Sequence, residues 1–312
     1  MNSPAETDDE RLRVSVTTSG GRRAVLLTTD GVAVEAEHHP PRGGSGHVEQ
    51  LAVVVAHGFT GALDRPAIRA AAEHFTGYGG VVTFSFRGHG RSGGRSTVGD
   101  LEVLDLDAAV AWARSLGYPK VATVGFSMGG SVVLRQAGRA EPVPDRVRPD
   151  AVVAVSSPAR WYYRGTAPMR RLHWVVTRPA GRLVSRVGLH TRIHPREWDP
   201  VPPSPVESVP YIAPTPLLVV HGDRDGYFPL DHPLSLAAAA DPASSELWIE
   251  RGFGHAENAA DPALLSRIGD WLADRVPPPG PGRAMMDAGT GTMDAGTETR
   301  DRHLRAAGPD DS

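Results

Sequence analysis

Five short apolar runs recur along the chain, and they constrain its fold more than any other feature. The runs are Leu51–Ala56, Val81–Phe86, Val121–Phe126, Ala151–Val155 and Leu217–Val220. Strands that are apolar at nearly every position are typical of a parallel sheet covered by helices on both faces. The runs therefore predict the central strands of one parallel sheet.

Helical patterns alternate with these runs. We expect helices at Pro66–Phe75, Leu101–Leu116, Met128–Arg139, Leu230–Ala240 and Pro262–Arg275. Pro66 suits the first position of a helix, and Asp100 is expected to cap the helix that follows it. Strands that alternate with helices in this way indicate repeated strand–helix units.

The N-terminal part predicts an antiparallel hairpin. The runs Ala24–Thr29 and Val32–Glu37 flank Asp30-Gly31, a pair typical of a two-residue turn. A last strand is expected at Glu246–Glu250. A hairpin followed by repeated strand–helix units predicts an α/β fold with a mostly parallel, doubly wound sheet.

One connection is far longer than the others. Residues 157–214 separate two of the core strands, whereas such connections usually have about two to six residues. We interpret this segment as a helical cap, inserted over the sheet edge where ligands bind, with a helix at about Arg170–Leu189. It holds nine arginines against three acidic residues, so the cap is locally basic in a chain whose net charge is −3.

Both ends of the sequence differ from the part between them. Residues 1–10 are polar and acidic, and residues 277–312 are rich in proline and glycine and repeat the sequence MDAGT. Neither segment has the periodicity of a helix or strand, so we expect two disordered tails around one domain at residues 11–276.

The composition excludes several classes of function. The chain has no cysteine, which rules out a thiol nucleophile, a disulfide scaffold and cysteine-based metal sites. A net charge of −3 argues against nucleic acid as a partner. Neither a signal peptide nor a membrane-spanning run is evident, so we expect a cytoplasmic protein with a small-molecule partner.

The strand Val121–Phe126 runs directly into Gly-Phe-Ser-Met-Gly. This is the G-x-S-x-G pattern of a sharp strand-to-helix turn, which would lift the hydroxyl of Ser127 clear of the sheet. The start of the next helix also favours negative charge that develops there. Ser127 is therefore the candidate nucleophile.

A nucleophilic serine needs a base and an acid that orients the base, and in this kind of fold they follow in the order Ser, Asp or Glu, His. Asp223 and Asp225 come after the strand Leu217–Val220, and His255 comes after the last strand. All of them lie at strand ends, on the side to which the turn points. Asp225 is the preferred acid, while Asp223 remains open as the acid or as a brace for the loop.

The oxyanion of an acyl-transfer reaction needs two backbone N–H donors. Met128 supplies one by its position after the nucleophile, and Phe59, after the strand Leu51–Ala56, is the candidate for the other. We interpret His57 and His221 as turn residues. His38, His39, His190 and His194 lack a metal-binding pattern, so no metal and no cofactor is expected.

Several motifs together resemble those of the α/β-hydrolase superfamily, in its serine-nucleophile, esterase- or lipase-like subgroup. They are HGFTG (57–61), FRGHGRSGG (86–94), GFSMGG (125–130), GDRDGYFP (222–229) and GFGHAEN (252–258), and the resemblance covers about residues 20–276. It implies the α/β-hydrolase fold, with Ser127 as nucleophile, His255 as base and Asp225 as acid. Arg87 begins the loop that usually supports the floor of the site. Ser85 stands where the family often has aspartate.

The resemblance implies hydrolysis of carboxylic esters through an acyl-enzyme. Ser127 argues against epoxide hydrolases and haloalkane dehalogenases, which use aspartate as nucleophile. Perhydrolysis by the same three residues stays open. The basic cap leaves open a thioesterase or a hydrolase of anionic acyl substrates. A further alternative is a non-catalytic binder of a ligand or a lipid surface, with the cap in peripheral contact with lipid.

Overall fold

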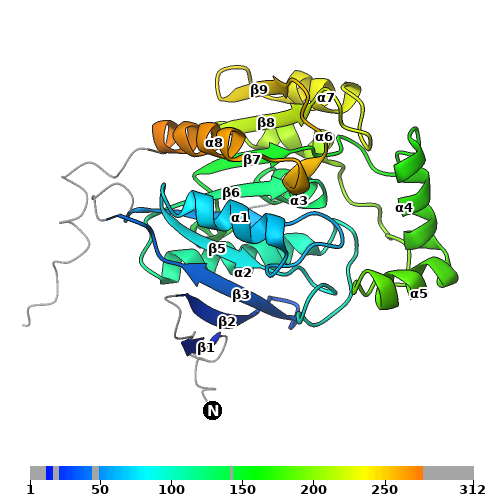
Figure 1. Cartoon of the computed structure of the whole chain (residues 1–312), viewed down its shortest axis with the longest axis horizontal. Coiled ribbons are helices and arrows are strands. Elements are labelled where there is room, and N and C mark those ends of the chain that lie inside the picture. Colours follow the sequence, from blue (N-terminus) through cyan, green and yellow to red (C-terminus); the bar gives the residue numbers. More distant parts are fainter. Residues whose placement is uncertain (1–11, 17–20, 44–48, 141–142, 277–312) are drawn as a thin grey trace, which may run out of the picture. The chain divides into compact units, whose positions relative to one another are not determined.

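A computed structural model describes the protein at residues 12–16, 21–43, 49–140 and 143–276 (Figure 1). The strands are β1 (Leu12–Val16), β2 (Arg22–Leu27), β3 (Ala33–His39), β4 (Leu51–Ala56), β5 (Gly80–Phe84), β6 (Lys120–Phe126), β7 (Ala151–Val155), β8 (Leu217–Gly222) and β9 (Ser245–Glu250). The two expected tails, residues 1–10 and 277–312, lie outside the described residues.

The helices are α1 (Pro66–Phe75), α2 (Glu102–Ser115), α3 (Met128–Ala137), α4 (Ala167–Thr177), α5 (Pro179–Gly188), α6 (Pro205–Ser208), α7 (Asp231–Ala239) and α8 (Pro262–Arg275). Short 3₁₀ turns occur at Asp145–Val147, Val209–Tyr211 and Ala256–Asn258. Among the described residues, no helix is both long and apolar enough to cross a membrane.

The strands form a nine-stranded sheet in the order β1-β2-β3-β5-β4-β6-β7-β8-β9. The pairs from β5 to β9 are parallel, while β1, β2 and β3 pair antiparallel with one another and β3 pairs antiparallel with β5. This is the predicted α/β-hydrolase fold class, with a mostly parallel sheet and an antiparallel N-terminal part. The strand β1 was not expected from the sequence.

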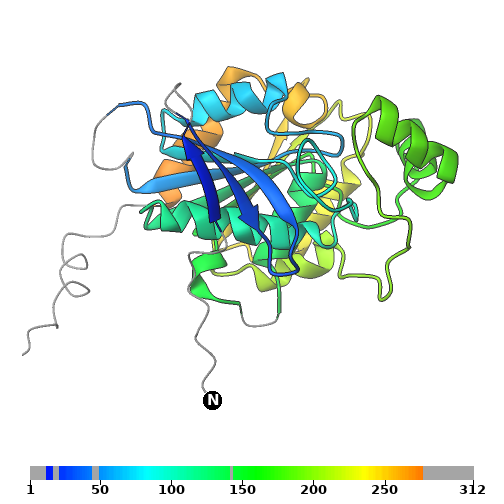
Figure 2. The same cartoon turned by 90° about the horizontal axis from the view of Figure 1, so that it is seen from below.

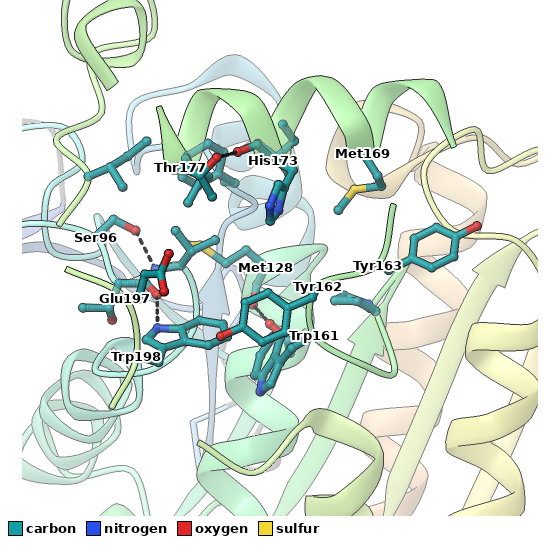
Figure 3. A pocket seen from close by; sticks show the side chains of 18 of the residues that line it. Ser96, Met128, Trp161, Tyr162, Tyr163, Met169, His173, Thr177, Glu197 and Trp198 are labelled. Atoms are coloured by element: carbon teal, nitrogen blue, oxygen red, sulfur yellow. Dashed lines mark hydrogen bonds between the residues drawn. The ribbon is translucent and has the colours of Figure 1, made fainter. Parts of the chain in front are cut away.

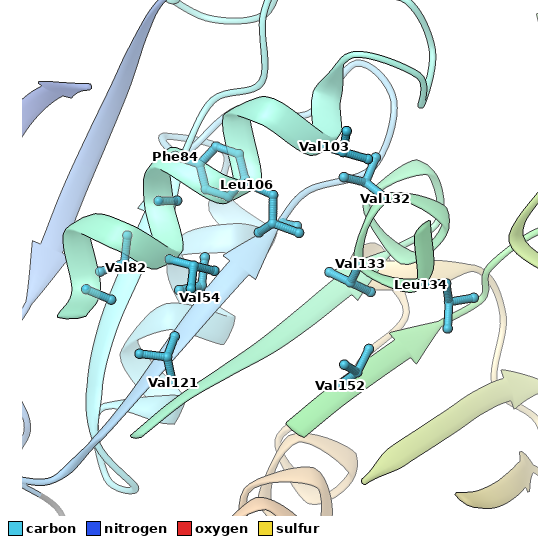
Figure 4. Packing of buried hydrophobic residues seen from close by; sticks show 14 of the residues in the cluster. Val54, Val82, Phe84, Val103, Leu106, Val121, Val132, Val133, Leu134 and Val152 are labelled. Atoms are coloured by element: carbon cyan, nitrogen blue, oxygen red, sulfur yellow. The ribbon is translucent and has the colours of Figure 1, made fainter. Parts of the chain in front are cut away.

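Two layers of helices cover the sheet. Side chains of α2 and α3 pack on one face, where Leu106 and Val133 contact residues of β4 and β6 (Figure 4). Helices α1 and α8 cover the other face (Figures 1 and 2), and their side chains form a second apolar cluster there. Both faces of the central strands are therefore buried, which explains why their sequences are apolar at nearly every position.

Three local expectations were wrong. The hairpin turn is longer than two residues, because Thr28 N–H bonds to the Val32 carbonyl at 3.0 Å and Leu27 pairs with Ala33. Asp100 does not cap α2, whose N-cap is Leu101, and its carboxylate lies 3.4 Å from Arg135 instead.

The third concerns the helix expected at about Arg170–Leu189. It is two helices, α4 and α5, which meet at Arg178 and Pro179. Proline has no N–H to donate to the preceding turn, so it ends one helix and begins the next. Between β7 and β8, residues 156–216 form the insertion, which carries α4, α5 and α6. In Figure 1, α4 and α5 stand away from the edge of the sheet.

Candidate active site

Ser127 lies at a sharp turn between β6 and α3. Its backbone has φ 51° and ψ −112°, a conformation that L-residues rarely adopt. The turn is possible because a Cβ at Gly129 would collide with the carbonyl oxygen of Ala56, and one at Gly125 would collide with that of Gly129. The glycines of the G-x-S-x-G pattern thus allow the helix to start directly against the strands.

Three of the predicted side chains meet at the carboxyl ends of β6, β8 and β9. The Nε2 atom of His255 lies 2.9 Å from the Oγ atom of Ser127. Its Nδ1 atom lies 2.8 Å from Oδ2 of Asp225. One ring therefore contacts the hydroxyl on one side and a carboxylate on the other, which is the arrangement that general-base activation of a serine requires.

The carboxylate of Asp225 is fully buried and well supplied with donors. Its Oδ1 atom accepts hydrogen bonds from the backbone N–H groups of Tyr227 at 2.8 Å and Phe228 at 3.1 Å. Burial alone would raise the pKa of Asp225, but the bond to His255 and these backbone bonds outweigh it and lower the pKa below its usual value. The side chain is thus held as an anion against the imidazole.

The alternative acid, Asp223, faces elsewhere. Its carboxylate accepts a hydrogen bond from the N–H of Gly252 at 2.6 Å, and so joins the loop after β8 to the loop after β9. His221 lies behind the site, where its Nε2 atom donates to the carbonyl of Phe228 at 2.8 Å. Both residues support the loop that carries Asp225.

The loop after β4 holds Phe59 between two anchored neighbours. The N–H of Gly58 donates to Glu257 at 3.0 Å, and the N–H of Thr60 points to Nε2 of His89 at 3.4 Å. The ring of His57 contacts the carbonyl of Gly58 at 2.7 Å. With its neighbours held in this way, Phe59 lines the same pocket as Ser127 and Met128.

The two histidines that anchor this loop are fully buried and uncharged. Burial lowers the pKa of His57 to about 3, and the neighbouring His89 adds to the shift. Burial likewise lowers the pKa of His89 to about 4. In each ring one nitrogen contacts a backbone carbonyl while the other contacts a backbone N–H, which suits a neutral imidazole.

The loop after β5 rests on a buried ion-pair network. Arg87 bonds to Asp105 at 2.8 Å and to Asp30, in the turn between β2 and β3, at 2.7 Å. Burial opposes the charge on Arg87, but these bonds raise its pKa above the usual value. Ser85 donates to Glu35 at 2.8 Å and accepts from the N–H of Leu63 at 3.1 Å.

Sequence reasoning missed two carboxylates that shape the site. One is Glu257, described above. The other is Glu102, which is fully buried and accepts bonds from Ser96, Thr97, Val98 and Gly99 at 2.6–3.1 Å. The loop at residues 96–98 forms part of the pocket wall. A glutamate at the first position of a helix was the one signal that could have identified Glu102.

Strained backbone is concentrated around this site. Among the described residues, the non-glycine positions with positive φ are Thr60, Val98, Ser127, Ser156, Tyr162, His190 and Ala256. Val98, Ser127 and Tyr162 line the pocket, while Ala256 follows His255 and donates to Ser156 at 3.1 Å. Such conformations persist only where the surroundings impose them, and they are typical of functional sites.

The pocket has a volume of about 450 Å³ and reaches from Ser127 into the insertion. Met169, His173 and Thr177 face it from α4, opposite the aromatic rings of Trp161, Tyr162 and Trp198 (Figure 3). Trp161 and Trp198 pack at 5.0 Å between ring centroids. The insertion therefore supplies most of the wall against which a substrate would lie. Four arginines of the insertion also line the pocket: Arg160, Arg164, Arg182 and Arg196.

The described residues contain no group of three or more histidine, cysteine, aspartate or glutamate side chains that could hold a metal ion. Among the histidines weighed as ligands, His38 bonds to Tyr118 at 2.9 Å and His39 lies 3.4 Å from Thr83. His194 accepts from the N–H of Arg196 at 3.3 Å.

Comparisons with known proteins agree with this fold. A family model described as the alpha/beta hydrolase fold matches residues 52–164. A search of curated proteins gives no match. Among solved structures, the esterase Pf2001 of Pyrococcus furiosus has a TM-score of 0.61 at 22% identity, and the alignment covers 88% of this chain and 97% of that chain.

Two further solved structures are similar. Est1E from Butyrivibrio proteoclasticus, with ferulic acid bound, has a TM-score of 0.56 at 18% identity, over 80% of this chain and 98% of that one. XC6422 from Xanthomonas campestris, described as a serine hydrolase without a lid, has a TM-score of 0.52 at 18% identity, over 84% and 95%. The sheet order, the family match over residues 52–164 and these solved structures together show that the chain has the α/β-hydrolase fold.

Proposed function

We propose that the protein is a serine hydrolase that cleaves carboxylic esters through an acyl-enzyme. The observation that carries this proposal is the continuous chain of contacts from Ser127 Oγ through His255 to Asp225, at 2.9 Å and 2.8 Å. The chain opens into a pocket large enough for an acyl group.

In the proposed reaction, Ser127 Oγ attacks the ester carbonyl while Nε2 of His255 takes its proton. The carbonyl π electrons move to the oxygen, which becomes the oxyanion of a tetrahedral intermediate. When this intermediate collapses, His255 returns the proton to the leaving alcohol. Water then attacks the acyl-enzyme with the same base, and the carboxylic acid leaves. Asp225 keeps the proton of neutral His255 on Nδ1 and stabilises the imidazolium.

The proposed oxyanion donors are the N–H groups of Phe59 and Met128. Both residues line the pocket beside Ser127. The neighbours of Phe59 already have acceptors, since Gly58 donates to Glu257 and Thr60 to His89. This supports the N–H of Phe59 as the group of this loop that faces the substrate. In other serine hydrolases, each such donor lowers the activation free energy of the kcat step by about 3–4 kcal/mol.

The test is the hydrolysis of p-nitrophenyl esters from acetate to palmitate. The aromatic wall of Trp161, Tyr162 and Trp198 makes an aromatic ester such as a ferulate a useful addition, since Est1E was solved with ferulic acid bound. We expect turnover over a limited range of acyl lengths and loss of turnover in Ser127→Ala. Ser235→Ala, at a half-buried serine on α7 outside the pocket, is the matched control.

A fluorophosphonate probe gives a second readout that does not depend on finding the substrate. It should label the wild type and the Ser235→Ala variant but not Ser127→Ala. Equal labelling of Ser127→Ala and wild type would contradict the proposal. Absence of both labelling and turnover in the wild type would favour the non-catalytic ligand binder.

An anionic acyl substrate, such as a thioester of a phosphate-bearing carrier, is a second candidate. Arg160 pairs with Asp231, and Arg182 donates to carbonyls at the end of α4. Arg164 and Arg196 line the pocket without a carboxylate partner among the described residues. A p-nitrophenyl monoester of adipic acid, compared with the neutral hexanoate, tests this candidate. Arg164→Gln together with Arg196→Gln should remove any preference for the charged ester.

A further inference from the structure

The outer side of the α4–α5 hairpin exposes large apolar side chains. We call these five residues the hairpin surface: Trp174 (48% exposed), Leu183 (62%), Val184 (51%), Val187 (69%) and Leu189 (37%). They come from α4, α5 and the residue after α5. Apolar side chains gathered in this way on a surface mark a place of contact with another phase or molecule.

The apolar residues of the hairpin surface contribute little to the fold. Helix α4 has no buried residue, and α5 buries only Gly181 and Ser185. The side chains that α4 turns inward, such as Met169 and His173, line the pocket (Figure 3). Packing against the sheet therefore does not account for the five apolar residues on the outer side.

The charge of the same segment is positive throughout. Residues 167–190 contain five arginines and no aspartate or glutamate: Arg170, Arg171, Arg178, Arg182 and Arg186. In the described part of the chain, none of the five forms an ion pair with a carboxylate. The chain as a whole has a net charge of −3, so this positive segment is a local departure.

We propose that the hairpin surface docks onto an anionic lipid bilayer. Short helices that carry apolar side chains beside arginines suit the boundary between lipid headgroups and acyl chains. At this boundary the apolar side chains are buried among the acyl chains and the arginines contact phosphates. A second copy of this chain fits less well. Two facing hairpins would bring ten arginines together without an acidic residue, and like charges at an interface are unfavourable.

Docking would also place the pocket close to the bilayer, because α4 contributes to both the hairpin surface and the pocket wall. The enzyme would then take esters from, or return products to, the lipid phase. Binding itself does not require turnover, so it can be measured even if the proposed hydrolysis is wrong.

The experiment is co-sedimentation of the full chain with vesicles of phosphatidylcholine, with and without phosphatidylglycerol, at low and high salt. We expect binding to the phosphatidylglycerol vesicles that weakens as salt rises. The variant Arg171→Gln/Arg186→Gln should weaken binding about fivefold for each arginine, equivalent to about 1 kcal/mol each. Val187→Asp should weaken it by about tenfold or more, because a carboxylate replaces the most exposed apolar side chain.

Leu234→Asp is the matched control, since Leu234 is 54% exposed on α7, outside the insertion. It should bind vesicles like the wild type. None of the substituted residues lines the pocket, so turnover of a short water-soluble ester should be unchanged in all of these variants.

Three results would overturn the proposal. One is equal or absent binding of the wild type to the two kinds of vesicle. Another is binding that Val187→Asp and the arginine variant leave unchanged. The third is a dimer in solution that Val187→Asp separates, which would assign the hairpin surface to a second copy of the chain.

Discussion

The sheet and the insertion differ in how far their residues are buried. Every residue of β4, β5, β7 and β8 is buried, whereas α4 buries none and α5 only two. The three side chains proposed to carry the reaction stand at the ends of the buried strands, while much of the pocket wall comes from the insertion. The proposed chemistry and the choice of substrate thus depend on parts of the molecule that differ widely in how firmly they are packed.

The largest effect should come from Asp225, the proposed acid at the end of β8. Asp225→Asn replaces the carboxylate that contacts His255, and we expect kcat for ester hydrolysis to fall by about 10⁴-fold, as the same change does in serine proteases. Asp223→Asn is the control, because its side chain can still accept the bond from Gly252. Steady-state kinetics with one short ester measures both. If the two variants lose the same activity, Asp225 has no special role.

The next comparison concerns stability. Leu106 on α2 is fully buried in the core (Figure 4), whereas Leu183 on α5 is 62% exposed. We expect Leu106→Ala to lower the free energy of unfolding by about 2–5 kcal/mol and Leu183→Ala to change it by less than about 0.5 kcal/mol. Urea denaturation gives both values. Equal losses would mean that the insertion is anchored as firmly as the sheet.

Acid should destabilise the sheet side of the molecule through its buried histidines. Burial lowers the pKa of His57 to about 3 and that of His89 to about 4, so the unfolded chain binds protons below about pH 6.5 that the folded chain cannot. The contribution of the two neutral histidines to the free energy of unfolding is complete above that pH. It is lost as the pH falls, by up to about 1.4 kcal/mol per pH unit for each histidine.

Urea midpoints measured from pH 7 to pH 5 check this expectation. His190→Gln, at an exposed position after α5, should follow the wild-type pH dependence. A midpoint that stays constant from pH 7 to pH 5 would contradict the expected loss of stability.

The smallest effect concerns Val98, whose φ of 58° is unfavourable for a β-branched residue. Glycine adopts this conformation freely, whereas alanine has a Cβ and pays about 1–2 kcal/mol of backbone strain in the folded state. We therefore expect Val98→Gly to be more stable than Val98→Ala, the reverse of the usual order. Because Val98 lines the pocket, both variants should also accept longer acyl chains. Thermal unfolding and the ester series test the two points, and Val98→Ala as the more stable variant would contradict the first.

The sequence predicted the sheet well because its signals are local. The bounds of α1 and α8 agree with the structure, since each helix begins with a proline at its first turn. The end of α4 and the start of α5 at Pro179 were not predicted, because the apolar pattern continues across this proline. The strand β1 was missed as well, in a segment without a long apolar run.

For the site, the residue types and their order along the chain indicated Ser127, Asp225 and His255, and the structure brings them within hydrogen-bond distance. Their catalytic roles remain predictions. Glu257 could not be found in this way, because its partner Gly58 lies 199 residues away and no pattern joins them. Contacts of this kind depend on how loops from different strands meet, which the sequence of either loop does not contain.

Ser127 and His255 are separated by 128 residues, and His255 follows β9, the outermost strand on its side of the sheet. A chain still being synthesised therefore carries Ser127 for a time without His255, its proposed base. At about 5–20 residues per second, the ribosome needs about 6–26 seconds to add these 128 residues. During that interval the nascent chain should not react with esters or with activity-based probes. Labelling of Ser127 would thus report how much of the protein has completed its sheet.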